Sequence, residues 1–199
     1  MSGVSMNGLL RPGGRLTHFG CVVGLFALMS FAAGLGHAET IGIYADPYGS
    51  SCSISASFGV TYVYVIHETN GAVASEFIAP KPACWTEATW IGDQNPFGPC
   101  VGCGDSQTGI TLGYGVCSSG AVPVLAIGYF VLGPSGVCCP YPVLPRPEAS
   151  EILVADCDFN MATATGWVGM INGNASCPCP YPVPVEETTW GQVKALYAE

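Results

Sequence analysis

The sequence predicts an all-β protein, an antiparallel immunoglobulin-like β-sandwich that is disulfide-rich and ends in a short C-terminal helix. Three observations predict this class. Ten of the eleven cysteines follow an apolar leader, which is typical of a protein folded where thiols oxidise to disulfides. Glycine and proline are abundant and only 10% of the residues are charged, which favours a loop-rich β protein. Several short segments also alternate with the period of two that half-buried strands show.

Residues 1–38 are predicted to be a signal peptide. Arg11 and Arg15 precede an uncharged apolar run at 19–36, and Gly36 and Ala38 occupy the −3 and −1 positions of a cleavage site. Cleavage leaves Glu39 as the first mature residue. An uncleaved membrane anchor is the alternative, because the run is close to the shortest spanning helix. Both readings predict a secreted or extracytoplasmic protein: periplasm, cell surface or extracellular medium. Membrane contact is expected only through the signal segment before cleavage.

The remaining chain is long enough for one acidic domain. We expect a disulfide-stapled sandwich at 39–184 and a helical tail at 185–199. Residues 39–199 contain all fourteen acids and only three lysines or arginines, a net charge of −11. Such a surface repels phosphate backbones and anionic headgroups, so nucleic acid is excluded as a partner.

Eight segments have the β-branched and aromatic composition of strands and are separated by turn signals. In chain order they are 40–45, 60–67, 73–79, 85–91, 110–116, 124–132, 151–155 and 165–171. The continuously apolar segment 124–132 is expected to be a central strand buried on both faces. Asn70 and Gly71 lie between two of the segments and predict a two-residue hairpin. Eight short strands favour a sandwich.

A pentapeptide, Cys-Pro-Tyr-Pro-Val, occurs twice, at 139–143 and at 179–183. Proline cannot donate ladder hydrogen bonds, so both copies are expected to be extended edge or connector segments. Each copy follows a second cysteine closely. This predicts a cysteine-anchored strap across the sandwich edge, with a proline-rich recognition site as the alternative.

The C-terminal tail is the one predicted helix. Thr189 and Gln192 form a capping box, and Trp190 and Tyr197 lie on one apolar face. Two turns are marginal in isolation, so this face is expected to dock on the sandwich or on another molecule.

The cysteines are expected to form structural disulfides. Cys100 and Cys103 have a knuckle-like spacing, but no second pair is suitably spaced for zinc, and the surrounding glycines and prolines do not fit a redox helix. We therefore expect no metal site and no cofactor. The disulfide candidates are Cys52, Cys84, Cys100, Cys103, Cys117, Cys138, Cys139, Cys157, Cys177 and Cys179. Sequence alone does not pair them.

Asp156, Asp158 and Asn160 resemble the start of a calcium loop. Met161 and Trp167 stand where the loop needs glycine and glutamate, so a strand-ending turn is the expected structure. A calcium site completed by acids from elsewhere stays open.

No catalytic residue is predicted, and we expect the protein not to be an enzyme. His67 is the only histidine after the leader, and no Gly-x-Ser-x-Gly elbow presents a serine to it. Glu68 and Glu76 are expected to approach each other across the predicted hairpin, an arrangement that glycosidases use but that also occurs by chance.

Aromatic residues are the main candidates for an interaction surface: Trp85, Trp90, Trp190 and Tyr197. We therefore expect a non-catalytic surface-binding or assembly protein, with a protein or a glycan at the cell surface as partner. The alternatives are a secreted carbohydrate-binding or carbohydrate-active protein, and a self-assembling subunit of an extracellular fibre.

The two ends of the mature chain carry a family resemblance. The front reads Ile-Gly-Ile-Tyr-Ala-Asp at 41–46, and the back reads Trp-Gly-Gln-Val-Lys-Ala-Leu-Tyr at 190–197. This resembles uncharacterised secreted bacterial proteins with an Ile-Gly-x-Tyr-x-Asp strand and a Trp-Gly-x-x-Lys-x-Leu-Tyr tail, which look like cohesin-type or immunoglobulin-like sandwiches. The resemblance implies an extracellular binding or structural role and assigns no functional residue. The tail here ends in Ala-Glu, where a basic last residue is usual in the group.

Overall fold

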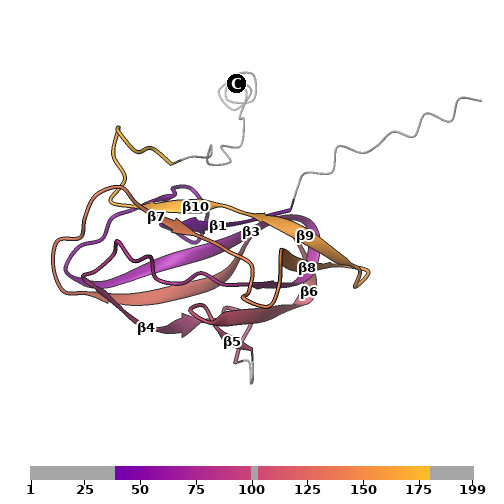
Figure 1. The fold of residues 1–199 in the computed structure, drawn as a ribbon. Helices are drawn as coiled ribbons and strands as arrows, with labels where there is room; N and C mark the ends of the chain where they lie inside the picture. The colour runs from indigo at the N-terminus through magenta and orange to yellow at the C-terminus, as the bar shows by residue number, and fades with distance from the viewer. Residues whose placement is uncertain (1–38, 100–102, 180–199) are drawn as a thin grey trace, which may run out of the picture. The chain divides into compact units, whose positions relative to one another are not determined.

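The computed structural model describes residues 39–99 and 103–179, and this part of the chain is built of ten strands in two sheets (Figure 1). All described residues belong to one compact unit of the chain, the second of two. The predicted signal peptide at 1–38 and the helix at 185–199 lie outside the described residues. The strands are β1 Thr40–Tyr44, β2 Ser53–Ile54, β3 Gly59–Phe77, β4 Ala88–Gln94, β5 Gly104–Asp105, β6 Gly109–Val131, β7 Cys139–Pro142, β8 Ile152–Asp156, β9 Met161–Gly166 and β10 Val168–Ile171.

The larger sheet is organised around two long strands, β3 and β6. Its order is β1-β9-β8-β3-β6-β4, with β5 attached to β6. β3 pairs with β6 along one edge, while its other edge pairs first with β1 and then with β8. Register shifts in the β3–β6 ladder, between Val65 and Ile66 and around Thr69 to Ala74, accompany this change of partner. β3 therefore links the two halves of the sheet.

The smaller sheet has the order β2-β10-β7. β10 is antiparallel to β7 and parallel to the short β2. The first copy of the proline-containing repeat forms β7, which lies at the edge of this sheet. Pro140 and Pro142 are accommodated there because an edge strand leaves alternate N–H positions unused by the ladder.

The core is formed by apolar side chains from both sheets, as a sandwich requires. At one end Trp85, Tyr129 and Tyr141 pack as an aromatic cluster, with ring centroids 4.6 to 6.4 Å apart. The Tyr141 hydroxyl donates to the carbonyl oxygen of Ala79 at 2.8 Å and lies 2.6 Å from the Tyr129 hydroxyl. Burial raises the pKa of Tyr129 to about 12, so both hydroxyls remain protonated hydrogen-bonding groups at neutral pH.

Four disulfides are described in the second unit. They join Cys52 to Cys179, Cys84 to Cys139, Cys117 to Cys157, and Cys138 to Cys177. Cys103 is also disulfide-bonded, and Cys100 lies outside the described residues. The adjacent Cys138 and Cys139 bond to different partners. The predicted fold class, a disulfide-rich all-β sandwich, is thus confirmed for the described part of the chain.

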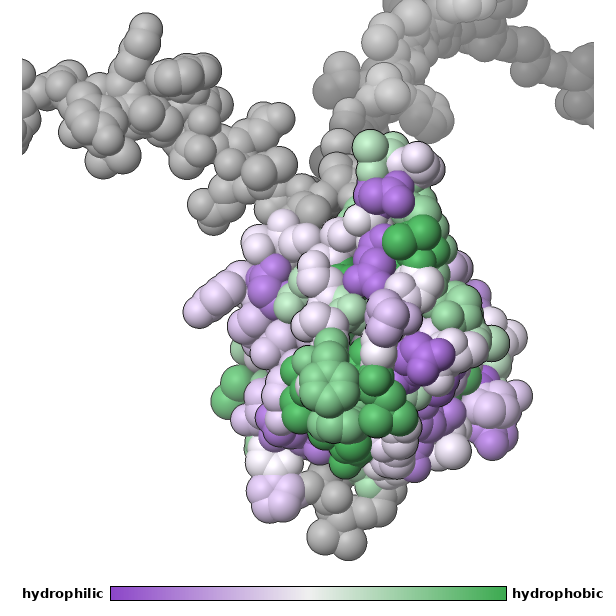
Figure 2. Space-filling view, turned by 90° about the vertical axis from the view of Figure 1, so that its left-hand side faces the viewer, coloured by the Kyte–Doolittle hydropathy of each residue, from purple (hydrophilic) through white to green (hydrophobic). Residues whose placement is uncertain are grey.

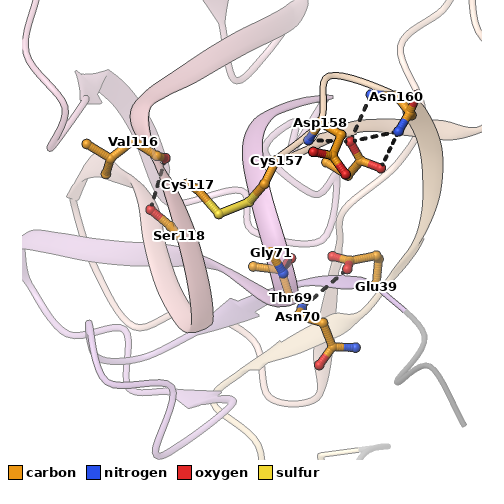
Figure 3. The surroundings of a disulfide bond; sticks show 11 residues. Glu39, Thr69, Asn70, Gly71, Val116, Cys117, Ser118, Cys157, Asp158 and Asn160 are labelled. Carbon is orange, nitrogen blue, oxygen red and sulfur yellow. Dashed lines mark hydrogen bonds between the residues drawn. A yellow bond between two sulfur atoms is a disulfide. The ribbon is translucent and has the colours of Figure 1, made fainter. Parts of the chain in front are cut away.

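The predicted hairpin at Asn70-Gly71 is wrong, because β3 runs through both residues. Gly71 is placed instead beside a disulfide, as Figure 3 shows. A β-carbon on Gly71 would lie 3.1 Å from Sγ of Cys157 and 3.9 Å from Sγ of Cys117. Glycine therefore lets the sulfurs pack closely on the strand, and the Asn-Gly pair has no hairpin role.

Two other strand boundaries differ from the sequence prediction. Segments 110–116 and 124–132 belong to one long strand, β6, whereas segment 165–171 is divided at Trp167 into β9 and β10. Both differences arise from pairing: β6 follows β3 along its whole length, and Trp167 marks the point where the chain passes from one sheet to the other. Within residues 39–99 and 103–179, no helix has the length and apolar character needed to cross a bilayer.

Candidate binding face

The outward face of β3, β6 and β4 is unusually apolar. Val60, Tyr62 and Tyr64 alternate with core residues along β3 and therefore point away from the core. Their register partners on β6 are Phe130, Gly128 and Ala126. Residues directly opposite each other in a ladder share a face, so these side chains form one continuous outer surface.

Six large apolar side chains on or next to this face are exposed to solvent, and we call them the apolar patch. They are Phe58 (74% exposed), Val60 (56%), Tyr62 (37%), Ile91 (53%), Phe130 (37%) and Leu132 (61%). Figure 2 shows a compact hydrophobic group on the side of the molecule where β3 begins and β6 ends. The sequence prediction that 124–132 is buried on both faces is therefore wrong at its end, where Phe130 and Leu132 reach solvent.

Local contacts hold the patch together. The rings of Phe58 and Phe130 meet edge to face, with centroids 6.1 Å apart. Ile91 and Tyr62 lie over Gly128, where a β-carbon would be 3.1 Å from Cγ1 of Ile91 and 3.3 Å from Cε1 of Tyr62. The missing side chain at Gly128 therefore lets neighbouring strands bring their apolar groups together.

A charged residue at the edge of the patch, Glu87, is acidic. The Leu132 amide donates to the carbonyl oxygen of Glu87 at 2.8 Å, which places exposed Glu87 beside the patch. The lysine and arginine of the described residues are engaged elsewhere. Lys81 donates through Nζ to the carbonyl oxygen of Trp85 at 2.7 Å, and Arg146 pairs with Glu76 at 3.2 Å.

A shallow hollow of about 290 Å³ lies further along the same face. Tyr64 on β3 and the 123–126 segment of β6 form its floor, and the loops that follow β1 and β4 form its walls. None of its lining residues is charged; they include Pro47, Tyr64, Gln94, Pro96, Pro123 and Leu125.

A second small core lies next to this hollow. Buried Tyr44, Cys52 and Ile66 form it, and Tyr64, Trp167 and Cys179 pack against it. The Tyr44 hydroxyl donates to Glu68 at 3.1 Å, and burial together with that carboxylate raises the pKa of Tyr44 well above its ordinary value. Tyr64 is thus shared by the small core and the hollow.

The predicted interaction residues differ in how far they are buried. Trp85 is fully buried in the aromatic cluster, which corrects its prediction as a surface residue. Its Nε1–H donates to Oγ of Ser135 at 2.8 Å. Trp90 is half-buried and donates through Nε1–H to Asp93 at 3.1 Å. Trp190 and Tyr197 lie outside the described residues. Sequence reasoning missed the apolar patch, although the alternation along 60–64 was a usable signal for its β3 part.

His67 belongs to a buried hydrogen-bond network and not to a hydrolase site. It is fully buried, its Nε2 lies 2.8 Å from Oε2 of Glu39, and its Nδ1 lies 2.8 Å from the Tyr114 hydroxyl. Burial lowers the pKa of His67, although the Glu39 carboxylate opposes this effect. Glu68 and Glu76, expected to meet across a hairpin, are eight positions apart on one strand, and Glu76 pairs with Arg146.

The two acidic turns are closed by their own backbone. Asp156 accepts hydrogen bonds from the amides of Asp158 and Asn160 at 2.8 Å each. Asp46 likewise accepts from the amides of Tyr48 at 2.9 Å and Ser51 at 3.1 Å, and also from the hydroxyl of Ser50 at 2.7 Å. Hydrogen bonds from the Asn160 side chain and backbone lower the pKa of Asp156. Across the described residues, no group of three or more His, Cys, Asp and Glu side chains could hold a metal ion.

Comparison with known proteins finds similarity only at the level of structure. No protein-family model matches the chain, and no curated protein matches its sequence. A cohesin from the scaffoldin B of Acetivibrio cellulolyticus, solved in complex with a Cel5 dockerin, is similar over 69% of this chain and all of that one, with 13% identity and a TM-score of 0.48. A non-cellulosomal cohesin of Archaeoglobus fulgidus is similar over 70% of this chain and 94% of that one, with 10% identity and a TM-score of 0.46.

A cohesin module of a Clostridium perfringens family 33 glycoside hydrolase is similar over 69% of this chain and 98% of that one, with 9% identity and a TM-score of 0.40. All three are cohesin modules. Because these scores lie below 0.5, the function proposed next depends only on the residues of this chain.

Proposed function

We propose that the protein is an exported, non-catalytic binding or assembly module that engages another protein through the apolar patch. The observation that carries this proposal is the clustering of six large apolar side chains on one sheet face, with two phenyl rings already in contact. Large exposed apolar patches on soluble domains mark interaction surfaces, because leaving them in water is unfavourable. The aromatic members have the size and rigidity typical of interface anchors.

The negative charge of the domain indicates the charge expected of its partner. The patch itself is uncharged, Glu87 stands at its edge, and the mature chain has a net charge of −11. A second copy of this chain is disfavoured by repulsion, whereas a surface with an apolar centre and lysine or arginine at its rim is complementary. The proposed partner is therefore a basic, apolar protein surface.

The disulfides support placement of the module outside the cytoplasm. At least four bridges join distant parts of the described chain, and such bridges form and persist in oxidising compartments. A binding partner is therefore to be sought among exported or surface-attached proteins.

Site-specific photocrosslinking in the exporting cell tests this function. We would place p-benzoylphenylalanine at Val60 or Ile91, with Val116, an exposed apolar residue of β6 outside the patch, as the matched control. The expected result is a discrete adduct with another protein from the patch positions and not from position 116. The partner, identified by mass spectrometry and purified, should bind F130S about tenfold or more weakly than wild type.

The rim charge gives a second measurement on the same complex. E87Q should reduce the association rate and its dependence on salt, while leaving the dissociation rate nearly unchanged. Equal adducts from patch and control positions would refute the proposal. An adduct with a second copy of the chain would favour the fibre-subunit alternative, and glycan binding lost in F130S would favour the carbohydrate-binding one.

A further inference from the structure

The chain leaves the described region on the same face as the uncharged hollow. Cys179 is bonded to Cys52, and both belong to or pack against the small core that includes Tyr64. Tyr64 also lines the hollow. The segment that follows Cys179 therefore starts close to the hollow.

We propose that residues 180–185, Pro-Tyr-Pro-Val-Pro-Val, occupy this hollow, with Tyr181 as the anchoring side chain. The inference is independent of the proposed function, because the hollow and the apolar patch share no residue, although Gln94 of the hollow donates to the Tyr62 hydroxyl of the patch. It assigns an intramolecular ligand to the hollow.

The first copy of the same motif shows what the sequence does in this fold. Cys139 is bonded to Cys84, and two residues later Tyr141 is fully buried. Tyr141 packs against Trp85 and Tyr129, and its hydroxyl donates to a backbone carbonyl. In the second copy Cys179 is likewise disulfide-bonded, and Tyr181 likewise follows it by two positions. In an extended segment residues i and i+2 lie on the same side, so an extended 179–181 segment would place Tyr181 on the side of Cys179.

The reach and the stiffness of the segment fit the site. A proline-rich segment favours the polyproline II conformation, which rises about 3.1 Å per residue, so six residues span roughly 19 Å. Since Cys179 packs against the same small core as Tyr64, and Tyr64 lines the hollow, this length is sufficient. A segment already extended in solution loses little conformational entropy on docking, which is why aromatic- and proline-lined grooves bind such segments.

The chemical character of residues 180–185 is also complementary to that of the hollow. Residues 180–185 carry no charge and are followed directly by two glutamates at 186 and 187. The hollow has no charged lining residue, and Pro47, Tyr64, Pro123 and Leu125 give it apolar walls. Gln94 and Asn95 also line the hollow. Nε2 of Gln94 donates to the Tyr62 hydroxyl at 3.0 Å and has a second N–H, and Oδ1 of Asn95 accepts from the Phe97 amide, which leaves its NH2 group as a donor for a backbone carbonyl.

Photocrosslinking from position 181 tests the inference in the full mature, oxidised protein. With p-benzoylphenylalanine in place of Tyr181, we expect an adduct at monomer mass whose crosslinked peptide contains 62–66 or 123–126. The same amino acid in place of Phe159, an exposed residue in the turn between β8 and β9, is the control and should give no such adduct. An adduct between two chains, an adduct elsewhere on the domain, or none would overturn the inference.

A substitution in the hollow provides a second, independent readout. Ala126→Glu places a carboxylate among the apolar walls and should reduce the crosslink yield at least about tenfold, because an unpaired charge is costly to bury. Tyr181→Ser leaves all described residues unchanged and should speed cleavage by a glutamate-specific protease after Glu187 relative to wild type. Unchanged crosslinking in the first variant, or unchanged cleavage in the second, would overturn the inference. Neither result depends on a protein partner, so the proposed function can fail while this inference holds.

Discussion

Removing the bridge between Cys117 and Cys157 should destabilise the domain strongly without altering its fold. The bridge joins β6 to the turn between β8 and β9, on the two sides of β3, and its sulfurs pack on Gly71 (Figure 3). Cys117 is exposed and Cys157 half-buried, so replacement of both by serine creates little buried cavity. The effect of the double substitution therefore measures the covalent link itself.

The size of the effect follows from the length of chain that the bridge closes. The two cysteines are 40 positions apart. The chain-entropy relation gives a stabilisation of about 4 kcal/mol for a loop of this length. This is a large share of the roughly 5–15 kcal/mol by which single domains are stable. Loss of the bridge should therefore bring the domain close to marginal stability at physiological temperature.

Denaturant unfolding of the oxidised mature protein measures this directly. The C117S/C157S variant should show a free energy of unfolding lower by about 3–4 kcal/mol and a steeper denaturant dependence, because its unfolded chain is more expanded. Val116→Ser, at an exposed neighbouring position, is the control and should change stability by less than about 0.5 kcal/mol. A loss below about 1 kcal/mol in the double variant, or free thiols at 117 and 157 in native protein, would refute the reasoning.

Two further predictions concern the buried network of His67 and the close packing of Gly166. Because burial lowers the pKa of His67 in the folded state, its stabilising effect is complete above its unfolded pKa of about 6.5 and declines as the pH falls towards the folded value. The difference in unfolding free energy between wild type and H67N should therefore be larger at pH 8 than at pH 5, and equal differences in urea titrations at both pH values would contradict this. A β-carbon at Gly166 would overlap the carbonyl oxygen of Val143 and lie 2.9 Å from Cδ1 of Ile152, so G166A should cost about 1–3 kcal/mol in thermal or urea unfolding. G133A, where a β-carbon meets nothing within 4 Å, should lower the unfolding free energy by less than about 0.5 kcal/mol. Similar losses of stability in both variants would contradict the prediction that the close contact at Gly166 causes the larger loss.

Local sequence patterns predicted short strands well when a single apolar segment forms the whole strand. Segment 40–45 became β1 and segment 151–155 became β8 nearly unchanged, because their alternation or apolar run matches the pairing that they make. The hairpin at Asn70-Gly71 failed because a turn dipeptide is also compatible with a strand that needs glycine beside a bulky neighbour. The neighbour is a disulfide formed by residues 40 positions apart, which no local window contains.

The candidate site was predictable only in part, for a related reason. The exposure of Phe130 could not be read from an apolar run, since the run looks the same whether one face or both are covered. Trp85 was one of the candidates for an interaction surface. It is instead enclosed by Tyr129 and Tyr141, which come from different strands. Which side of a strand meets the second layer is decided by topology.

The amino-acid sequence by itself determined the class of the protein: an acidic, glycine- and proline-rich β domain with paired cysteines behind an apolar leader. These properties depend on composition or on short sequence periods. They are therefore the same whichever long-range contacts the chain makes. Tertiary structure alone decided which cysteines bond, which aromatic side chains are buried, and which sheet face stays open to a partner. Each of these depends on contacts between residues far apart in the chain, which exist only once β3 and β6 have paired and the second sheet has covered one of their faces.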